Sequence, residues 1–245
     1  MTLESDRLES EFDATAEHYD VMVGLNPGYH EHLRTAADAL AERLTPGDGP
    51  LRLADLGCGS GASTVALVDA LGPAASDAEI LGVDASDGML AVARRKAWPA
   101  GVRFQHGMAE DVAAGHWGLD RPLDGVLACY LFRNVQDRDG AVAAVYDVLA
   151  PDGWLVVQEY SVAGSRRSAA LWTFICWAVV IPLSLVLTRR TTLYRYLWRS
   201  VLRFDSVTRF EARLRAAGFT DVSTRSVDGW QHGILHTVVG RRPAA

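Results

Sequence analysis

The stretch ADLGCGSG, from Ala54 to Gly61, decides the fold that the sequence predicts. It ends a short apolar run, Leu51–Leu56, and precedes Ala62–Leu71, whose composition is typical of a helix. Glycines at a strand-to-helix turn permit a tight turn and a close approach of the backbone to a ligand, and the helix N-terminus adds backbone amides. The stretch therefore predicts a ligand-binding turn between a first strand and a first helix.

A carboxylate follows this turn at the spacing that a nucleoside site needs. Asp84 ends a second predicted strand, Ile80–Asp84, and lies about twenty residues beyond the glycines, where it can accept hydrogen bonds from both ribose hydroxyls. Gly57, Gly59 and Ala62 also satisfy the GxGxxG/A dinucleotide pattern, so a nicotinamide dehydrogenase is an alternative. Asp55 favours a cationic ligand, such as the sulfonium and ammonium of S-adenosylmethionine, because its charge would oppose a pyrophosphate.

Strands and helices alternate along the chain beyond the turn. Predicted strands at Val102–His106, Leu123–Tyr130 and Trp154–Tyr160 are interleaved with predicted helices at Asp87–Trp98 and Asp139–Leu149. This alternation indicates parallel strands joined by helical crossovers, and therefore an α/β fold.

The pattern changes after Tyr160. Two apolar and basic segments come first, followed by a helix and two strands joined by a turn around Asp228-Gly229; these are Ala169–Leu187, Thr191–Arg203, Val207–Ala217, Thr220–Val227 and Ile234–Val239. No linker or internal repeat separates domains, so we expect one domain over residues 1–245. Its parts would be an N-terminal helical lid (1–45), a cofactor-binding core (46–165), a helical cap insertion (166–204) and a C-terminal helix with the last two strands (205–245).

Composition and charge narrow the class of protein. The chain is 49% hydrophobic and 22% charged, which excludes disordered, collagen-like and low-complexity sequences. Its three cysteines lie far apart without metal-ligand spacing, so we expect neither a disulfide framework nor a metal site. The net charge of -6 combines 26 Asp/Glu against 11 Lys/Arg in residues 1–165 (-15) with 4 against 13 in residues 166–245 (+9). The acidic first twenty residues lack an apolar stretch, so we expect a cytoplasmic protein.

One apolar run, Leu171–Leu187, approaches the length of a membrane span. A single crossing would place the last two strands on the far side of the membrane from the first strand, although all belong to one sheet. We therefore expect a cap helix interrupted by Pro182, either buried or dipping into a membrane interface. Its flanks, Arg166-Arg167 and Arg189-Arg190, and the arginines up to Arg203 favour a peripheral contact with anionic lipid.

Motifs along nearly the whole chain carry a family resemblance. They are Phe12-Asp13, Tyr19-Asp20, the glycine stretch, Gly82–Ser86 with Met89-Leu90, Arg133-Asn134-Val135 with Asp137, Val148–Gly153, Glu159-Tyr160-Ser161, Tyr194–Leu197 and Ala216–Phe219. With them the chain resembles class I S-adenosylmethionine-dependent methyltransferases, and more narrowly the menaquinone/ubiquinone C-methyltransferase (UbiE-type) family. The resemblance implies a Rossmann-like, doubly wound, seven-stranded and mostly parallel sheet, with an antiparallel last strand and an inserted helical cap.

The resemblance also implies a cofactor, S-adenosylmethionine, and its contacts. Gly57, Cys58, Gly59 and Gly61 would enclose the methionine moiety, with Asp55 near its ammonium and Tyr19 closing over its carboxylate. Asp84 would bind the ribose, Ala85, Met89, Ala109 and Glu110 would flank the adenine, and Cys129 would lie beside the sulfonium.

Methyl transfer to an aromatic carbon needs aligned reactants and a neighbouring hydroxyl that loses its proton. Arg133, just past the fourth strand, could stabilise the phenolate, although pairing with Asp137 is the alternative; His30 and Tyr160 are the other catalytic candidates. For substrate contacts we expect Tyr130 and Asn134 at the pocket mouth, Trp172 and Trp177 in the cap, and His232 near the last strand. For Asn134 the residue type favours a cap for a helix over Asp137–Leu149 as the alternative to a substrate contact.

Three functions remain open at this point. The first is C-methylation of a lipophilic prenylated quinol or a related aromatic. The second is O-, N- or terpenoid C-methylation of another hydrophobic metabolite by the same fold, and the third is an inactive cofactor-binding interaction module at the membrane. We expect no nucleic-acid partner, because the cap is apolar and no base-reading motif is present. The sequence leaves the oligomeric state open.

Overall fold

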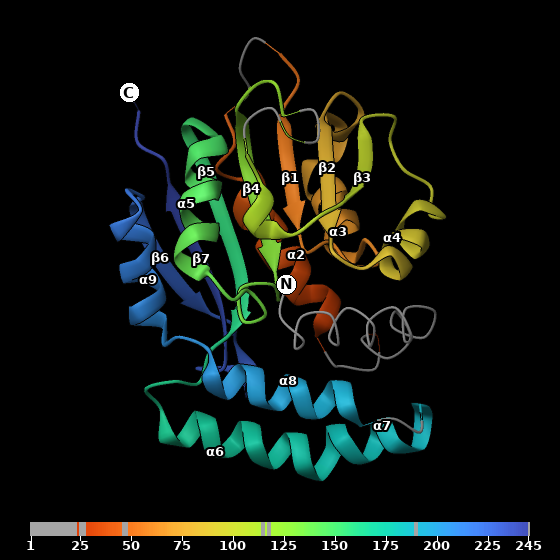
Figure 1. The fold of residues 1–245 in the computed structure, drawn as a ribbon, viewed down its shortest axis with the longest axis vertical. Helices are drawn as coiled ribbons and strands as arrows, with labels where there is room; N and C mark the ends of the chain where they lie inside the picture. The colour runs from red at the N-terminus through yellow and green to blue at the C-terminus, as the bar shows by residue number, and fades with distance from the viewer. Residues whose placement is uncertain are drawn as a thin grey trace.

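The structure is a computed structural model, and it describes residues 24, 28–45, 49–113, 116, 119–188 and 191–244. Within these residues, seven strands form one sheet in the order β3-β2-β1-β4-β5-β7-β6 (Figure 1). The strands are β1 Arg52–Leu56, β2 Glu79–Asp84, β3 Val102–His106, β4 Leu123–Cys129, β5 Leu149–Tyr160, β6 Thr220–Ser226 and β7 Leu235–Arg241. β1 to β5 pair in parallel, whereas β7 runs antiparallel to β5 and β6, so the predicted mostly parallel sheet with an antiparallel last strand is confirmed.

Helices cover both faces of the sheet and form a cap at one end of it. They are α2 Tyr29–Ala41, α3 Ala62–Leu71, α4 Asp87–Arg94, α5 Arg138–Val148, α6 Arg166–Ile175, α7 Ile181–Thr188, α8 Thr192–Arg203 and α9 Val207–Ala216. One hydrophobic cluster joins β-strand residues such as Leu53 and Leu127 to α2 and α3, and a second joins Leu155 and Val157 to α5 and α9. Parallel strands buried on both faces are nearly continuous apolar runs, which is why the sequence located them.

The strand order reverses between β1 and β4, because β2 and β3 lie on one side of β1 while β4 and β5 lie on the other. Ligands in open α/β sheets bind at the carboxyl ends of the strands at such a switch point. The glycine turn after β1 lies at this position. The topology therefore places the predicted nucleoside site where the sheet leaves a crevice.

A cap made of α6, α7 and α8 lies beyond the carboxyl ends of the parallel strands, with α8 between the sheet and the other two helices (Figure 1). α6 and α7 are one continuous helix, joined by a π-helical turn at Cys176–Val180. The backbone amide of Ile181 donates to the carbonyl of Cys176, five residues back. The predicted interruption at Pro182 is therefore wrong: the wider turn absorbs the proline without ending the helix.

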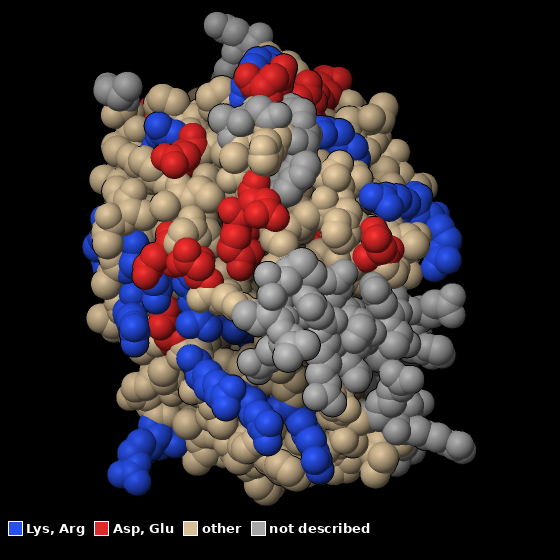
Figure 2. Space-filling view, in the orientation of Figure 1, with Lys and Arg blue, Asp and Glu red and all other residues tan. Residues whose placement is uncertain are grey.

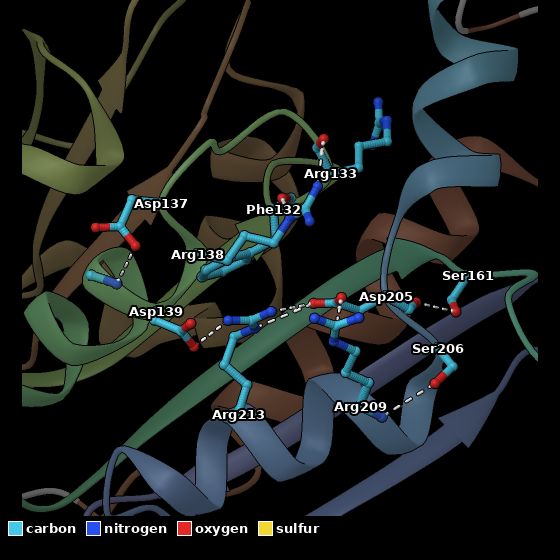
Figure 3. A network of polar contacts seen from close by, with 11 residues as sticks. Phe132, Arg133, Asp137, Arg138, Asp139, Ser161, Asp205, Ser206, Arg209 and Arg213 are labelled. Carbon is cyan, nitrogen blue, oxygen red and sulfur yellow. Dashed lines mark hydrogen bonds and ion pairs between the residues drawn. The ribbon is translucent and has the colours of Figure 1, made fainter.

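A polar network attaches the end of the cap to the sheet (Figure 3). The Ser161 hydroxyl, just past β5, donates to the Asp205 carbonyl over 2.8 Å. The Asp205 carboxylate accepts from Arg213 Nη2 at 2.8 Å, and Arg213 also pairs with Asp139 at the start of α5. Asp205 is buried, and these bonds fix the point where α8 leads into α9.

Candidate functional site

A pocket opens at the carboxyl ends of β1, β2 and β4. The β1–α3 turn, the end of β2, the segment after β3, the segment after β4 and the first turn of α2 contribute to its wall. The lining residues are Tyr29, Leu33, Gly57, Cys58, Gly59, Ser60, Ala62, Ser63, Val83, Asp84, Ala85, Ser86, Met89, Gly107, Met108, Ala109, Glu110, Cys129, Tyr130, Leu131, Arg133, Asn134 and Val135.

The glycine turn is shaped by left-handed backbone conformations. Gly57 has φ +71°, and a side-chain carbon there would lie 2.9 Å from Leu131 Cδ1. Gly59 has φ +54°, but a side-chain carbon there would meet no atom within 4 Å. Gly57 is therefore required by packing, whereas Gly59 leaves open space on the wall of the pocket for a ligand.

Three backbone amides of this turn already donate hydrogen bonds to the end of β2. Gly57 and Cys58 donate to the Val83 carbonyl at 2.8 and 3.0 Å. The Gly59 amide donates to Asp84 Oδ2 at 2.8 Å. Because a pyrophosphate would need such amides for itself, this geometry argues against the dinucleotide alternative.

Asp84 is held in a fixed orientation at the end of β2. Its Oδ2 accepts from Gly59, and its Oδ1 accepts from the Ser86 amide at 2.9 Å. Ser86 in turn caps α4 by accepting from the Met89 amide. A carboxylate oxygen has lone pairs for more than one donor, so the two oxygens can also accept the two hydroxyls of a ribose. The carboxylate of Asp84 and the open space at Gly59 thus fit a nucleoside-bearing cofactor.

Asp55 lies behind the pocket wall. It is fully buried, and its Oδ2 accepts hydrogen bonds from the hydroxyls of Ser63 at 2.7 Å and Thr64 at 2.6 Å. Its Oδ1 has no hydrogen-bond partner among the described residues. Burial raises the pKa of Asp55 to about 7, against the opposing effect of the two hydroxyls.

The charge of the lining suits a cationic ligand. Asp84 and Glu110 contribute carboxylates, and among the described residues Arg133 is the one cation on the wall. Arg133 is paired with Glu159, which is buried at the end of β5. The unbalanced charge of the lining is therefore negative, which favours a sulfonium over a pyrophosphate.

The Glu159 carboxylate accepts three hydrogen bonds, two of which come from Arg133. Oε1 accepts from Arg133 Nη1 at 2.6 Å, and Oε2 accepts from the Arg133 backbone amide at 3.1 Å. Oε1 also accepts from the amide of Tyr160 at 3.0 Å. Arg133 Nη1 further donates to the Tyr130 carbonyl at 2.6 Å. Arg133 therefore pairs with Glu159 and not with Asp137, which instead caps α5 by accepting from the Gly140 amide.

A stack of aromatic rings runs from the pocket to the cap. The ring centroids of Tyr29 and Tyr130 are 5.6 Å apart, those of Tyr130 and Tyr160 are 5.1 Å apart, and those of Tyr160 and Trp172 are 5.0 Å apart. Tyr130 lines the pocket and has φ +59°, which is uncommon for a residue with a side chain. Burial raises the pKa of the Tyr130 phenol well above its usual value.

Comparisons with known proteins agree with this site. The ubiE/COQ5 methyltransferase family matches over residues 1–240. The chain belongs to this family. It is an S-adenosylmethionine-dependent methyltransferase, and the predicted family, enzyme class and cofactor are confirmed.

Curated relatives in the family cover most of the chain. The ubiquinone/menaquinone biosynthesis C-methyltransferase UbiE of Methylobacterium nodulans is 31% identical over 231 residues, which are 91% of this chain and 86% of that protein. The demethylmenaquinone methyltransferase of Thermus thermophilus is 32% identical over 187 residues, 76% of this chain and 80% of the relative.

Solved structures show the fold. A SAM-dependent methyltransferase of Thermotoga maritima, described as a possible histamine N-methyltransferase, has a TM-score of 0.61 at 18% identity and covers 96% of this chain and 99% of its own. Phosphoethanolamine N-methyltransferase 2 of Haemonchus contortus, in complex with S-adenosyl-L-methionine, has a TM-score of 0.57 at 15% identity, covering 85% of this chain and 52% of its own. The predicted Rossmann-like fold of the ubiE/COQ5 family member is thereby confirmed.

Most residues predicted to contact the cofactor line the pocket of this methyltransferase. They are Gly57, Cys58, Gly59, Asp84, Ala85, Met89, Ala109, Glu110 and Cys129. Asp55 and Gly61 are not among the lining residues, and Tyr19 lies outside the described residues. Their individual roles in binding remain predictions.

The substrate and catalytic candidates divide between the pocket and its surroundings. Tyr130, Asn134 and Arg133 line the pocket. Asn134 does not cap α5; its Oδ1 accepts from the hydroxyl of Tyr196 in α8 at 3.3 Å, which links the pocket to the cap. The remaining candidates are absent from the described lining: His30 and His232 are exposed, Tyr160 and Trp172 are buried in the aromatic stack, and Trp177 is exposed on the cap.

Several residues of the site were not identified from the sequence, and two of them, Tyr29 and Glu159, matter for its geometry. Tyr29, and not its neighbour His30, lines the pocket, because Tyr29, Leu33 and Leu40 share the buried face of α2. The spacing of these apolar residues at i, i+4 and i+11 could have shown which face of the helix is buried. Glu159 belongs to one of the family motifs, but no local pattern reveals its partner Arg133, 26 residues away in sequence.

Proposed function

We propose that this ubiE/COQ5 family member C-methylates a reduced prenylated quinone or a closely related lipophilic aromatic. The observation that carries the proposal is the division of the pocket wall. Asp84 and the glycine turn, joined by the Gly59–Asp84 hydrogen bond, form a polar half for the cofactor. Tyr29 stacks on Tyr130 and Arg133 lies over the Tyr130 ring at 5.7 Å, so these three form an aromatic and cationic half. Relatives named ubiquinone/menaquinone biosynthesis C-methyltransferase and demethylmenaquinone methyltransferase support this substrate class.

The residues of the aromatic half suit the chemistry of a quinol ring. S-adenosylmethionine, when bound, supplies the methyl group at its sulfonium. A ring carbon becomes a strong nucleophile when a neighbouring hydroxyl is ionised, and a free phenol has a pKa of about 10. A cation facing that oxygen in a water-poor site stabilises the phenolate, and Arg133 is placed to supply one. Glu159 would act as the positioning residue that keeps Arg133 at the wall.

The other groups near the reacting atoms would remain neutral. Burial raises the pKa of the Cys129 thiol well above its usual value, and it does the same for the Tyr130 phenol. Neither group therefore competes as a nucleophile for the methyl group at neutral pH. They contribute an apolar wall that excludes water and aligns the ring.

The test is direct. Purified enzyme is incubated with S-adenosylmethionine bearing a labelled methyl group and with demethylmenaquinol, and the product is located by mass spectrometry with fragmentation. A label on a ring carbon is expected, and it should be absent with an Asp84→Ala variant. A label on oxygen or nitrogen would instead establish the second function, and tight cofactor binding without transfer to any of a panel of quinols would support an inactive module.

We further propose that the enzyme works at the cytoplasmic face of a membrane, where a prenylated quinol resides. Its apolar and arginine-rich cap supports this location, since α6 to α8 lie beyond the carboxyl ends of the parallel strands (Figure 1). Tyr196 of α8 also donates to Asn134, which lines the pocket. Fractionation of cells expressing the tagged chain tests it: part of the protein should sediment with membranes and be released by high salt. Full recovery in the soluble fraction at low salt would contradict the location.

A further inference from the structure

The outer face of the α6–α7 helix is an exposed apolar strip. Leu171, Phe174, Val179, Leu183 and Leu185 are 40 to 67% exposed. The helix from Arg166 to Leu185 is long and apolar enough to cross a membrane by length and composition, yet only 22% of its most apolar window is buried in the protein. Monomeric soluble proteins rarely leave such a continuous apolar face uncovered, so this strip is expected to contact something.

Arginines run beside the strip. Arg195, Arg199 and Arg203 are spaced four residues apart and therefore form one row along α8. Figure 2 shows blue side chains in a row over α8, next to a mostly tan surface over α6 and α7 that is blue only at the start of α6. All three are exposed, and none forms an ion pair with another residue that the structure describes. Arg195 also packs over the Trp177 ring at 5.5 Å, which joins the row to the strip.

The inner face of the same helix is fixed to the protein. Trp172, Cys176, Ile181 and Ser184 are buried. Trp172 Nε1 donates to the Trp198 carbonyl at 3.4 Å, and Trp198 Nε1 donates to the Thr173 hydroxyl at 3.2 Å. Crossing a membrane would remove this packing. The helix must therefore present its outer face while staying parallel to α8.

We propose that the α6–α7 strip and the α8 arginine row form one docking face for an anionic lipid surface, with the helix lying in the plane of the interface. At 1.5 Å per residue the helix is about 30 Å long, and its apolar side chains would enter the acyl boundary while the arginines contact headgroup phosphates. The inference rests on the proposed function, because an enzyme that acts on a lipophilic substrate must reach the membrane in which that substrate resides.

Charge distinguishes a lipid surface from a second copy of the chain. Apposition of two such faces by a two-fold axis would bring two unpaired arginine rows together, which is unfavourable. An anionic membrane complements the arginines and the apolar strip at once. The net charge of -15 over residues 1–165 would meanwhile keep the acidic core turned away from the lipid.

Flotation of the full-length protein with vesicles tests the docking face. Vesicles of phosphatidylglycerol and phosphatidylethanolamine should bind the protein at low salt, and vesicles of phosphatidylcholine alone should bind it far less. Phe174→Glu/Leu185→Glu should lower the partition coefficient at least about 100-fold, since each side chain gives up its burial in lipid. Arg199→Ser/Arg203→Ser should lower it about 30-fold on anionic vesicles, at about 1 kcal/mol for each arginine.

Matched variants away from the cap serve as controls. Val65→Glu changes an apolar side chain on α3 that is 40% exposed, and Arg34→Ser/Arg95→Ser removes two exposed arginines, one in α2 and one at the end of α4. Both should float like the wild type. Unchanged melting temperatures of all variants, and unchanged turnover of a short-chain, water-soluble quinol, confirm that only docking is altered. Flotation requires no substrate, so failure of the proposed methylation would leave its result readable.

Three outcomes overturn the inference. One is equal flotation with anionic and neutral vesicles. Another is flotation of the Phe174→Glu/Leu185→Glu variant at the wild-type level. The third is a wild-type dimer in sedimentation that the same variant converts to monomer without change in lipid binding, which would assign the face to a second copy.

Discussion

The two halves of the pocket are built in different ways. In the cofactor half, backbone amides of the β1–α3 turn bind the end of β2, and Asp84 is oriented by the amides of Gly59 and Ser86. In the substrate half, side chains carry the structure: aromatic rings stack from Tyr29 to Trp172, and Arg133 is fixed by Glu159. The cofactor half depends on the path of the backbone, which few substitutions alter. The substrate half depends on side chains, so a few substitutions can change the ligand that it binds. The contrast predicts that substitutions in the two halves have separable effects.

The largest expected effect breaks the cofactor half. Asp84→Ala removes the proposed acceptor for the ribose hydroxyls, together with the acceptor for the Gly59 and Ser86 amides. Hydrogen bonds to a charged group contribute about 1.5 to 3 kcal/mol each, so we expect the Kd for S-adenosylhomocysteine to rise at least about 100-fold by calorimetry. Asp87→Ala, an exposed neighbour outside the described lining, is the control and should bind like the wild type. Equal loss in both variants would refute the role of Asp84.

The next effect breaks the substrate half and leaves the cofactor half intact. Arg133→Gln should lower kcat about 100-fold without changing the Kd for S-adenosylhomocysteine, because the phenolate loses its cation. Glu159→Gln should lower kcat less, since Arg133 keeps its charge but loses its fixed orientation. Rescue of the Arg133→Gln variant by raising the pH, which ionises the quinol directly, would separate this role from a purely structural one. If kcat stays normal in Arg133→Gln, the cation is not needed.

A pH experiment tests the burial of Asp55. Burial raises the pKa of the Asp55 carboxyl from 3.8 to about 7. Between these two pH values the folded state keeps the carboxyl proton, whereas the unfolded state has lost it. Stability from Asp55 is therefore greatest below pH 4 and falls as the pH rises toward 7, by about 1.4 kcal/mol per unit. Compared with Asp55→Asn, the wild-type free energy of unfolding in urea should decline by this slope over that range. Parallel curves for the two proteins would show that Asp55 is not buried as a neutral acid.

The smallest effect tests the link between the substrate half and the cap. Tyr196→Phe removes a long hydrogen bond of 3.3 Å to Asn134. Such a bond between neutral groups contributes about 0.5 to 1 kcal/mol, so KM for the quinol should rise roughly two- to fivefold with kcat unchanged. Steady-state kinetics with a detergent-dispersed quinol measures this. A fall in kcat alone would mean that the cap acts on the chemical step and not on binding.

The cofactor half could be predicted from the sequence, and the substrate half only in part. The glycine turn and Asp84 lie in a local pattern on buried strands, and the helix Ala62–Leu71 and the strand Val102–His106 were located to the residue. The substrate half depends on contacts between distant segments. Tyr160 and Trp172 stack behind Tyr130. Glu159, near the end of β5, forms an ion pair with Arg133, which follows the neighbouring strand β4. The π-helical turn at Cys176–Val180 was missed because a proline in an apolar run more often ends a helix.

The backbone conformation of Tyr130 predicts how this position varies among relatives. Its left-handed backbone would suit glycine or asparagine better, so retaining a tyrosine there costs about 1 kcal/mol of stability. Selection accepts such a cost only where the ring itself is needed. Position 130 should therefore act as a marker of acceptor class: relatives that share this chain's acceptor should keep an aromatic residue there, and lineages that have changed acceptor should drift to glycine or asparagine.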